Sequence, residues 1–143
     1  MNNAQRPGII HVLLVEDNDG DVLLIRQALK TPSIRLELHV ASTGESALEF
    51  VRGNNPRPHV IILDLNLPEK TGGEVLQELK SDGELRKIPV VVLTSSGALS
   101  DVQSAYGWQA AGYIRKPEDV DEYFAAVAAL ERYWTQTVLL PAA

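Results

Sequence analysis

Short apolar runs recur along the chain at intervals that fit the strands of a parallel sheet. The runs at 9–15, 59–64 and 88–94 are apolar at nearly every position, which is typical of strands buried on both faces. The run at 35–40 alternates polar and apolar residues, as a strand nearer the sheet edge does, and a short fifth run spans 112–117. We therefore predict five strands.

Apolar residues at helical spacing fill the stretches between these runs. The predicted helices begin after the acidic cluster at 16–21, near residue 44, after the loop at 69–73, near residue 100 and at residue 118. This alternation predicts an α/β fold, with a doubly wound five-stranded parallel sheet covered on both faces through right-handed crossovers. We expect one domain at 9–135, a flexible N-terminus at 1–8 and a C-terminal tail at 136–143.

The amino-acid composition argues against several classes of function. Thirteen Lys and Arg against nineteen Asp and Glu give a formal net charge of −6, which disfavours binding to nucleic acid. The chain has no cysteine, and therefore no disulfide, thiolate nucleophile or cysteine metal site. It shows neither a signal peptide nor an apolar segment long enough to span a bilayer, so we expect a cytoplasmic protein without membrane contact.

Polar side chains stand at the ends of four of the five predicted strands. Glu16 and Asp17 follow the first, Asp64 ends the third, Thr94 ends the fourth and Lys116 ends the fifth. Because the carboxyl ends of parallel strands meet at one edge of a sheet, we expect these side chains to lie together. Three close carboxylates repel one another by roughly 1 to 4 kcal/mol per pair, and all-oxygen ligands suit a hard cation, for which we predict Mg²⁺.

These groups predict a phosphoryl-transfer site. Asp64 would attack the phosphoryl group and form an aspartyl phosphate, while Mg²⁺ and Lys116 neutralise the phosphoryl oxygens. Asp17 would bind the metal directly and Glu16 directly or through water. The backbone carbonyl of Asn66 would be a further ligand, because the chain turns there after the third strand.

In order and spacing, these motifs resemble the receiver domain of two-component response regulators. The motifs are the acids Glu16-Asp17, the phosphoacceptor Asp64, the switch hydroxyl Thr94 and the pair Lys116-Pro117, and the resemblance covers about residues 9–135. It implies a flavodoxin-like (βα)₅ fold, phosphotransfer from a phosphohistidine of a sensor kinase, and no enzymatic activity beyond self-phosphorylation and slow self-dephosphorylation. It also implies that Thr94 and Tyr113 move on phosphorylation and alter the face of the fourth helix, fifth strand and fifth helix.

A narrower resemblance is to the stand-alone receivers that serve bacterial and cyanobacterial phytochromes. It is carried by the segment 14–18 with Asp21, by the loop 65–68, and by Tyr123-Phe124 and Tyr133-Trp134 near the end. It implies a phytochrome-type histidine kinase as partner. The chain departs from the commonest receiver pattern at Glu16, where Asp is frequent, and at Ser95, where Ala is frequent.

The last predicted helix carries more apolar surface than one core stripe needs. Val120, Phe124 and Val127 fit a core stripe, Tyr123, Leu130 and Trp134 form a second stripe, and apolar residues 138–140 follow. Extra apolar stripes on a small domain often mark a partner face. We therefore predict a homodimer through the fourth helix, fifth strand and fifth helix, helped by the tail; the alternative is a broad core contact.

Two other functions stay open from the residues. An aspartate-nucleophile phosphatase of the haloacid dehalogenase type also uses a strand-end Asp and Mg²⁺, but it normally needs an acid where this chain has Asn66. A flavodoxin-like carrier of flavin phosphate should offer hydroxyls and backbone donors after the first strand, where this chain has acids that repel phosphate.

The three histidines are interpreted as structural. His11, His39 and His59 are scattered before or within predicted strands and show no mutual ligand spacing, so we assign them neither a metal nor a phosphorelay role.

Overall fold

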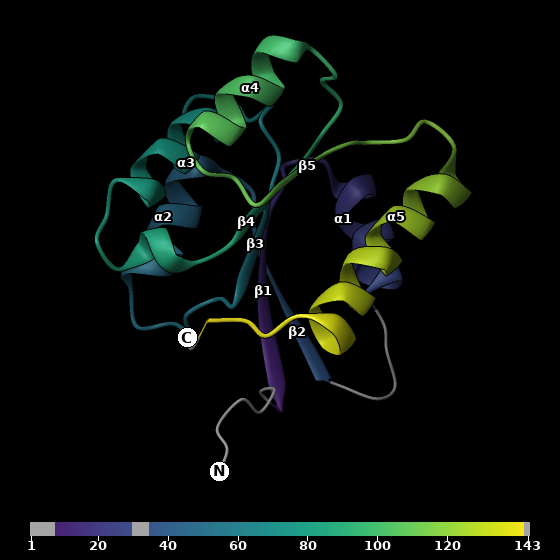
Figure 1. The fold of residues 1–143 in the computed structure, drawn as a ribbon, viewed down its shortest axis with the longest axis horizontal. Helices are drawn as coiled ribbons and strands as arrows, with labels where there is room; N and C mark the ends of the chain where they lie inside the picture. Colours follow the sequence, from purple (N-terminus) through teal and green to yellow (C-terminus); the bar gives the residue numbers. More distant parts are fainter. Residues whose placement is uncertain (1–7, 30–34, 142–143) are drawn as a thin grey trace.

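The five apolar runs form one parallel sheet, as predicted. The computed structural model describes residues 8–29 and 35–141, so the segment 1–8, expected to be flexible, lies outside them except for Gly8. The strands are β1 (Ile9–Val15), β2 (Arg35–Ala41), β3 (Val60–Leu63), β4 (Val90–Thr94) and β5 (Gly112–Arg115). Their order in the sheet is β2-β1-β3-β4-β5, with every neighbouring pair parallel (Figure 1). The α/β fold with a five-stranded parallel sheet is therefore confirmed.

Within the described residues, five α-helices connect or follow these strands. They are α1 (Asp19–Ala28), α2 (Gly44–Arg52), α3 (Gly72–Lys80), α4 (Leu99–Gly107) and α5 (Val120–Arg132). A 3₁₀ turn at Leu85–Lys87 and a π-helical turn at Tyr133–Thr137 were not predicted. Four of the helices start at a side chain that accepts a hydrogen bond from the first turn, namely Asn18, Thr43, Thr71 and Asp119.

The helices cover both faces of the sheet, with α2, α3 and α4 on one side and α1 and α5 on the other (Figure 1). Successive side chains of β1 point alternately to the two faces of the sheet. Leu13 and Val15 pack with α2, α3 and α4, whereas Ile10, Val12 and Leu14 pack with α1 and α5. Because β3 and β4 are buried along their whole length, the polar groups that follow them are exposed to ligands only beyond the strand ends.

The last helix turns a different stripe into the core than the one we predicted. Val127 is buried, but Val120 and Phe124 are 64% and 42% exposed, whereas Tyr123 and Trp134 are buried. At about 100° per residue, positions 123, 127 and 134 fall within roughly 40° of one another, and 120 and 124 lie beyond that arc. The assignment of Val120 and Phe124 to the core stripe is therefore wrong.

The pairing of β1 with β3 at the centre of the sheet brings their carboxyl ends side by side. β1 and β3 are neighbours in register, with Val15 opposite Leu63, and the Asp64 N–H donates to the Val15 carbonyl at 3.1 Å. The chain order reverses between these two strands, and such a point leaves a crevice beyond the carboxyl ends. In the described part of the chain, no helix is long and apolar enough to cross a membrane.

Candidate functional site

Three carboxylates meet where β1 and β3 end. Glu16 and Asp17 follow β1 and Asp64 follows β3, and one oxygen from each lies within 4.8 Å of the others. Glu16 and Asp64 are buried, whereas Asp17 is exposed. The acid cluster of Glu16, Asp17 and Asp64 thus forms where the strand ends predicted it, with one member open to solvent.

The ammonium of Lys116 lies among these acids. Its Nζ is 2.8 Å from Glu16 Oε1, 3.1 Å from Asp64 Oδ2 and 3.1 Å from Asp21 Oδ2. The backbone of Lys116 extends the β4–β5 pairing, because its N–H donates to the Thr94 carbonyl at 2.7 Å. The side chain of Lys116 is only 9% exposed, so the ion pairs are shielded from solvent.

Backbone N–H groups orient the two buried carboxylates. The Asn18 N–H donates to Glu16 Oε2 at 3.1 Å, and the Asn66 N–H donates to Asp64 Oδ1 at 3.0 Å. Each carboxylate therefore has one oxygen held by the turn that follows it and the other held by Lys116. The strand-to-loop turns fix these side chains before any ligand arrives.

For each of Glu16 and Lys116, burial and the contact with the other residue shift the pKa in opposite directions. Burial raises the pKa of Glu16 to about 7; the hydrogen bond from Lys116 opposes the rise and the charge of Asp64 adds to it. Burial by itself would lower the pKa of Lys116. The hydrogen bond to Glu16 and the negative charges of Glu16 and Asp64 outweigh burial, so the pKa of Lys116 is raised. Lys116 therefore stays protonated at neutral pH, while the charge of Glu16 depends on the cations around it.

The predicted switch residues flank the cluster without joining it. Thr94 is fully buried at the end of β4, and its Oγ1 accepts a hydrogen bond from Asn66 Nδ2 at 3.4 Å. Tyr113, on β5, donates its hydroxyl proton to the Ser96 carbonyl at 2.8 Å. Tyr113 is thus tied to the loop after β4, and Ser95 in that loop is exposed.

The start of α3 presses against the backbone of Asp64. The Gly72 N–H donates to the Leu65 carbonyl at 3.1 Å, and a Cβ on Gly72 would lie 2.1 Å from the Asp64 carbonyl oxygen. Only a residue without a side chain permits this approach. We expected residues 69–73 to form the loop before this helix, but α3 already begins at Gly72, so both glycines belong to its first turn.

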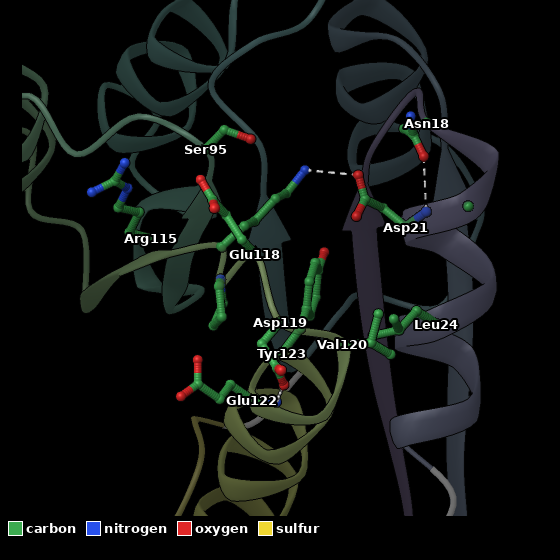
Figure 2. A pocket seen from close by; sticks show the side chains of 13 residues that line it. Asn18, Asp21, Leu24, Ser95, Arg115, Glu118, Asp119, Val120, Glu122 and Tyr123 are labelled. Atoms are coloured by element: carbon green, nitrogen blue, oxygen red, sulfur yellow. Dashed lines mark hydrogen bonds and ion pairs between the residues drawn. The ribbon is translucent and has the colours of Figure 1, made fainter.

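Sequence reasoning missed the contact of Asp21 with Lys116. Figure 2 shows Asp21 of α1 across from Tyr123 of α5, while Asn18 and Asp119 cap their own helices. These residues line a cleft of about 860 Å³ beside the cluster. Asp21 entered the sequence analysis only through the narrower resemblance, because acids in the first turn of a helix are common and suit its dipole.

Comparison with known proteins assigns the family. A model of the response regulator receiver domain matches residues 12–128, which is most of the chain. This chain belongs to the response regulator receiver family. Its fold is therefore that of a receiver, and neither the phosphatase nor the flavin carrier is favoured.

The receiver is similar to regulators of phytochrome systems. It is 42% identical to the response regulator Rcp1 of Synechocystis sp. over 137 residues, which cover 92% of this chain and 93% of that protein. The structure of Mn²⁺-bound Rcp1 superposes with a TM-score of 0.89, covering 95% of this chain and all of that one. The phosphorylated cyanobacterial phytochrome response regulator RcpA, 39% identical, superposes with a TM-score of 0.90, covering 93% of this chain and 99% of that one.

Near the other end of the receiver's sheet, the histidines lie together, which contradicts our interpretation that they lack ligand spacing. His11 Nδ1 is 3.0 Å from His39 Nε2, and the His11 N–H donates to His59 Nδ1 at 3.0 Å. Burial and the neighbouring His11 lower the pKa of His39 and of His59. The β1–β2 pairing and the turn before β3 bring these rings together, and neither can be read from sequence spacing.

Proposed function

We propose that this receiver accepts a phosphoryl group on Asp64, with Lys116 and Thr94 assisting the transfer. The observation that carries the proposal is the Lys116 ammonium, which contacts Glu16 and Asp64 at the carboxyl end of the sheet. The carboxylates there need positive charge, and a lysine supplies it as a mobile point charge that can move to a phosphoryl oxygen. Asp64 itself is buried but lies beside exposed Asp17, so a donor can approach from one side.

The acid cluster suits a divalent cation, and we propose Mg²⁺. Glu16, Asp17 and Asp64 offer only carboxylate oxygens, which Mg²⁺ prefers, and their oxygens lie within 4.8 Å of one another. We assign the backbone carbonyl of Asn66 as a further ligand. When bound, the metal would supply positive charge that offsets the charge of the cluster and of the phosphoryl oxygens.

The side chains divide the work of the transfer. An oxygen of Asp64 attacks phosphorus, so that an O–P bond forms while the N–P bond to the donor histidine breaks and the histidine nitrogen keeps the electron pair. The Asn66 N–H orients the Asp64 carboxylate, as its 3.0 Å hydrogen bond indicates. Lys116 and the Thr94 hydroxyl then bind phosphoryl oxygens.

Asn66 separates this function from that of a phosphatase. The aspartate-nucleophile phosphatases place an acid two residues after the nucleophile, where it protonates the leaving group and activates water. An amide can do neither, and here its Nδ2 donates to Thr94. We therefore propose a signalling protein that catalyses only its own phosphorylation and slow dephosphorylation.

We propose that the signal leaves through α4, β5 and α5. When Thr94 turns toward a phosphoryl group, it gives up its hydrogen bond with Asn66, and the loop after β4 moves with it. Tyr113 is bound to that loop through the Ser96 carbonyl and so follows the change. The partner that supplies the phosphoryl group is a histidine kinase of the phytochrome type, a proposal supported by the similarity to Rcp1 and RcpA. We place the protein in the cytoplasm, without contact with nucleic acid or membrane.

We also propose that a second copy of the chain covers this face. An apolar groove of about 450 Å³ runs between α4, β5, the end of α5 and the tail. Around it, Tyr106 and Tyr133 are 51% exposed and Leu139 is 60% exposed. We assign residues 9–135 to the receiver unit and 136–143 to a tail that contributes to the contact, because burying such residues is a main source of dimer stability.

Intact mass after incubation with acetyl phosphate tests the transfer. With Mg²⁺, wild type should gain one phosphoryl group that hydroxylamine removes, and it should gain none in EDTA. Asp64→Asn should gain none, whereas Asp19→Asn, which changes an exposed acid at the start of α1, should behave as wild type. Equal labelling of Asp64→Asn would place the phosphoryl group elsewhere and overturn the proposal.

Light scattering at low micromolar concentration tests the dimer. Wild type should have twice the chain mass, and the double change Tyr133→Ser with Leu139→Ser should give monomers. Leu23→Ser, at a 58% exposed position of α1, is the matched control and should stay dimeric. A wild-type monomer, with and without acetyl phosphate, would contradict this part of the proposal.

A further inference from the structure

Two histidines and a glutamate converge on one face of the paired strands β1 and β2. The register places His11 opposite Glu37 and Leu13 opposite His39, so His11, Glu37 and His39 point to the side covered by α2. Their donor atoms lie within 4.8 Å of one another. Phosphoryl transfer does not use these residues, because His11 and His39, which pairs with Leu13, lie roughly 16 and 10 Å before Glu16 along the direction of β1.

The spacing of the donor atoms fits a metal ion. His11 Nδ1 is 3.0 Å from His39 Nε2 and 3.7 Å from Glu37 Oε2. Ligand atoms that bind a tetrahedral ion at about 2.0–2.1 Å are about 3.3 Å apart, which lies between the two observed distances. Shifts of a few tenths of an ångström would therefore accommodate an ion.

We propose that His11, Glu37 and His39 bind one divalent transition-metal ion, with Zn²⁺ as the best-suited occupant. Two imidazole nitrogens and one carboxylate oxygen form a donor set that Zn²⁺ accepts, with a water molecule as fourth ligand. Mg²⁺ instead prefers oxygen ligands in octahedral geometry. Ligand chemistry thus separates this imidazole site from the acid cluster at the other end of β1.

A metal ion can replace the hydrogen bond between His11 and His39 if the two ring protons lie on the nitrogens that face away from it. The contact between His11 and His39 joins two ring nitrogens, so one of them carries a proton and the other accepts it. A neutral imidazole holds its single proton on either nitrogen. If His11 carries its proton on Nε2 and His39 on Nδ1, both facing nitrogens present lone pairs to the ion.

Neighbouring rings already hold the two imidazoles in place. The His59 ring stacks on that of His11 with centroids 5.9 Å apart and planes 5° apart, and His59 Nδ1 accepts from the His11 N–H. Phe50 of α2 packs against the His39 ring at 5.0 Å. Binding an ion therefore requires little further ordering of these side chains.

The ion would connect the edge strand β2 to the central strand β1. Among the described strands, β2 pairs with β1 alone, so the hydrogen bonds to β1 are what hold it in the sheet. A ligand that binds the folded state alone stabilises it, and here Glu37 and His39 come from β2 while His11 comes from β1. Zn²⁺ should accordingly raise the unfolding temperature of the receiver.

Cobalt provides a coloured probe for the site. The full chain is titrated with Co²⁺ in excess Mg²⁺, which occupies the acid cluster, and the strong visible absorption of four-coordinate Co²⁺ is recorded. Wild type should bind one equivalent, which Zn²⁺ displaces. Glu37→Gln and His39→Gln should weaken binding by at least about tenfold. Glu49→Gln, which removes an exposed charge from α2, and Asp64→Asn should both bind as wild type does.

A second measurement shows whether a variant that fails to bind the ion is still folded. Glu37 is 45% exposed, so Glu37→Gln should keep the wild-type circular dichroism spectrum and the Mg²⁺-dependent phosphorylation while losing the shift of unfolding temperature that Zn²⁺ produces. Absence of one-equivalent Co²⁺ binding to wild type in excess Mg²⁺ would overturn the proposal. Binding that persists unchanged in a folded Glu37→Gln or His39→Gln variant would overturn it too.

Discussion

Two adjacent glycines should respond to alanine in opposite directions. A Cβ on Gly72 would lie 2.1 Å from the Asp64 carbonyl oxygen and 2.6 Å from Leu65 Cα. Both obstacles are backbone atoms, so no rotation of a side chain can relieve them. A Cβ on Gly73 meets nothing closer than Thr71 Oγ1 at 3.8 Å, an ordinary contact. Neither glycine has a positive φ, so the difference is one of space alone.

The magnitudes follow from this geometry. A contact of 2.1 Å must open by more than an ångström, and overpacking of this kind should lower the free energy of unfolding of Gly72→Ala by about 3 kcal/mol. Gly73→Ala should raise it by up to about 1 kcal/mol, because alanine loses less conformational freedom in a helix. The two variants should therefore differ by about 3 to 4 kcal/mol, or by roughly 10 °C in unfolding temperature.

Urea unfolding in Mg²⁺ and the rate of phosphorylation by acetyl phosphate measure the two consequences. Gly72→Ala must push back the backbone of Asp64, whose carboxylate is oriented by Asn66 and Lys116, so phosphorylation should slow even where the variant is fully folded. Gly73→Ala should be phosphorylated at the wild-type rate. Stabilities of the two variants within 0.5 kcal/mol of each other, a small fraction of the expected gap, would refute the reasoning.

Three further outcomes can be measured on the same protein. Burial raises the pKa of Glu16 to about 7, so between pH 4.5 and 7 the folded state keeps a proton that the unfolded state loses. In EDTA, the free energy of unfolding of wild type, taken relative to that of Glu16→Gln, should therefore fall by up to about 3 kcal/mol as pH rises through this range. Urea unfolding at a series of pH values measures this change. Trp134→Ala should lose about 3 to 5 kcal/mol of stability by the same assay, whereas Leu139→Ala, at a 60% exposed position, should lose less than about 1 kcal/mol in the monomer. Tyr113→Phe removes the hydroxyl that donates to the Ser96 carbonyl; it should cost about 1 kcal/mol and leave phosphorylation by mass unchanged.

The fold could be predicted because local patterns and topology agree along the chain. Each strand apart from β2 is rich in apolar residues, and acids such as Asp119 mark a helix start in the sequence itself. The rotation of α5 could not be predicted in the same way. Val120 and Phe124 are as apolar as Tyr123 and Val127, and only the start of the helix after Asp119 decides which pair meets the sheet.

The acid cluster was predictable for a physical reason. Glu16 and Asp64 follow strands that end together, and parallel topology alone brings strand ends to one edge. The cluster of His11, Glu37 and His39 depends instead on the register of β1 against β2, since a shift of one residue would turn one strand's side chains to the opposite face. An alternating edge strand does not reveal its register from the sequence.

Hydrogen bonds and close packing hold the buried carboxylates of the receiver's site in place. Asp64 has one oxygen fixed by the Asn66 N–H and the other by Lys116, and its own carbonyl is pressed by Gly72. Glu16 is fixed in the same manner by Asn18. The cluster thus carries electrostatic repulsion that a cation relieves, while the surrounding turns prevent the carboxylates from relieving it by moving apart. The free energy of cation binding then goes into neutralising charge rather than into ordering side chains, which favours the phosphoryl transfer that we propose at Asp64.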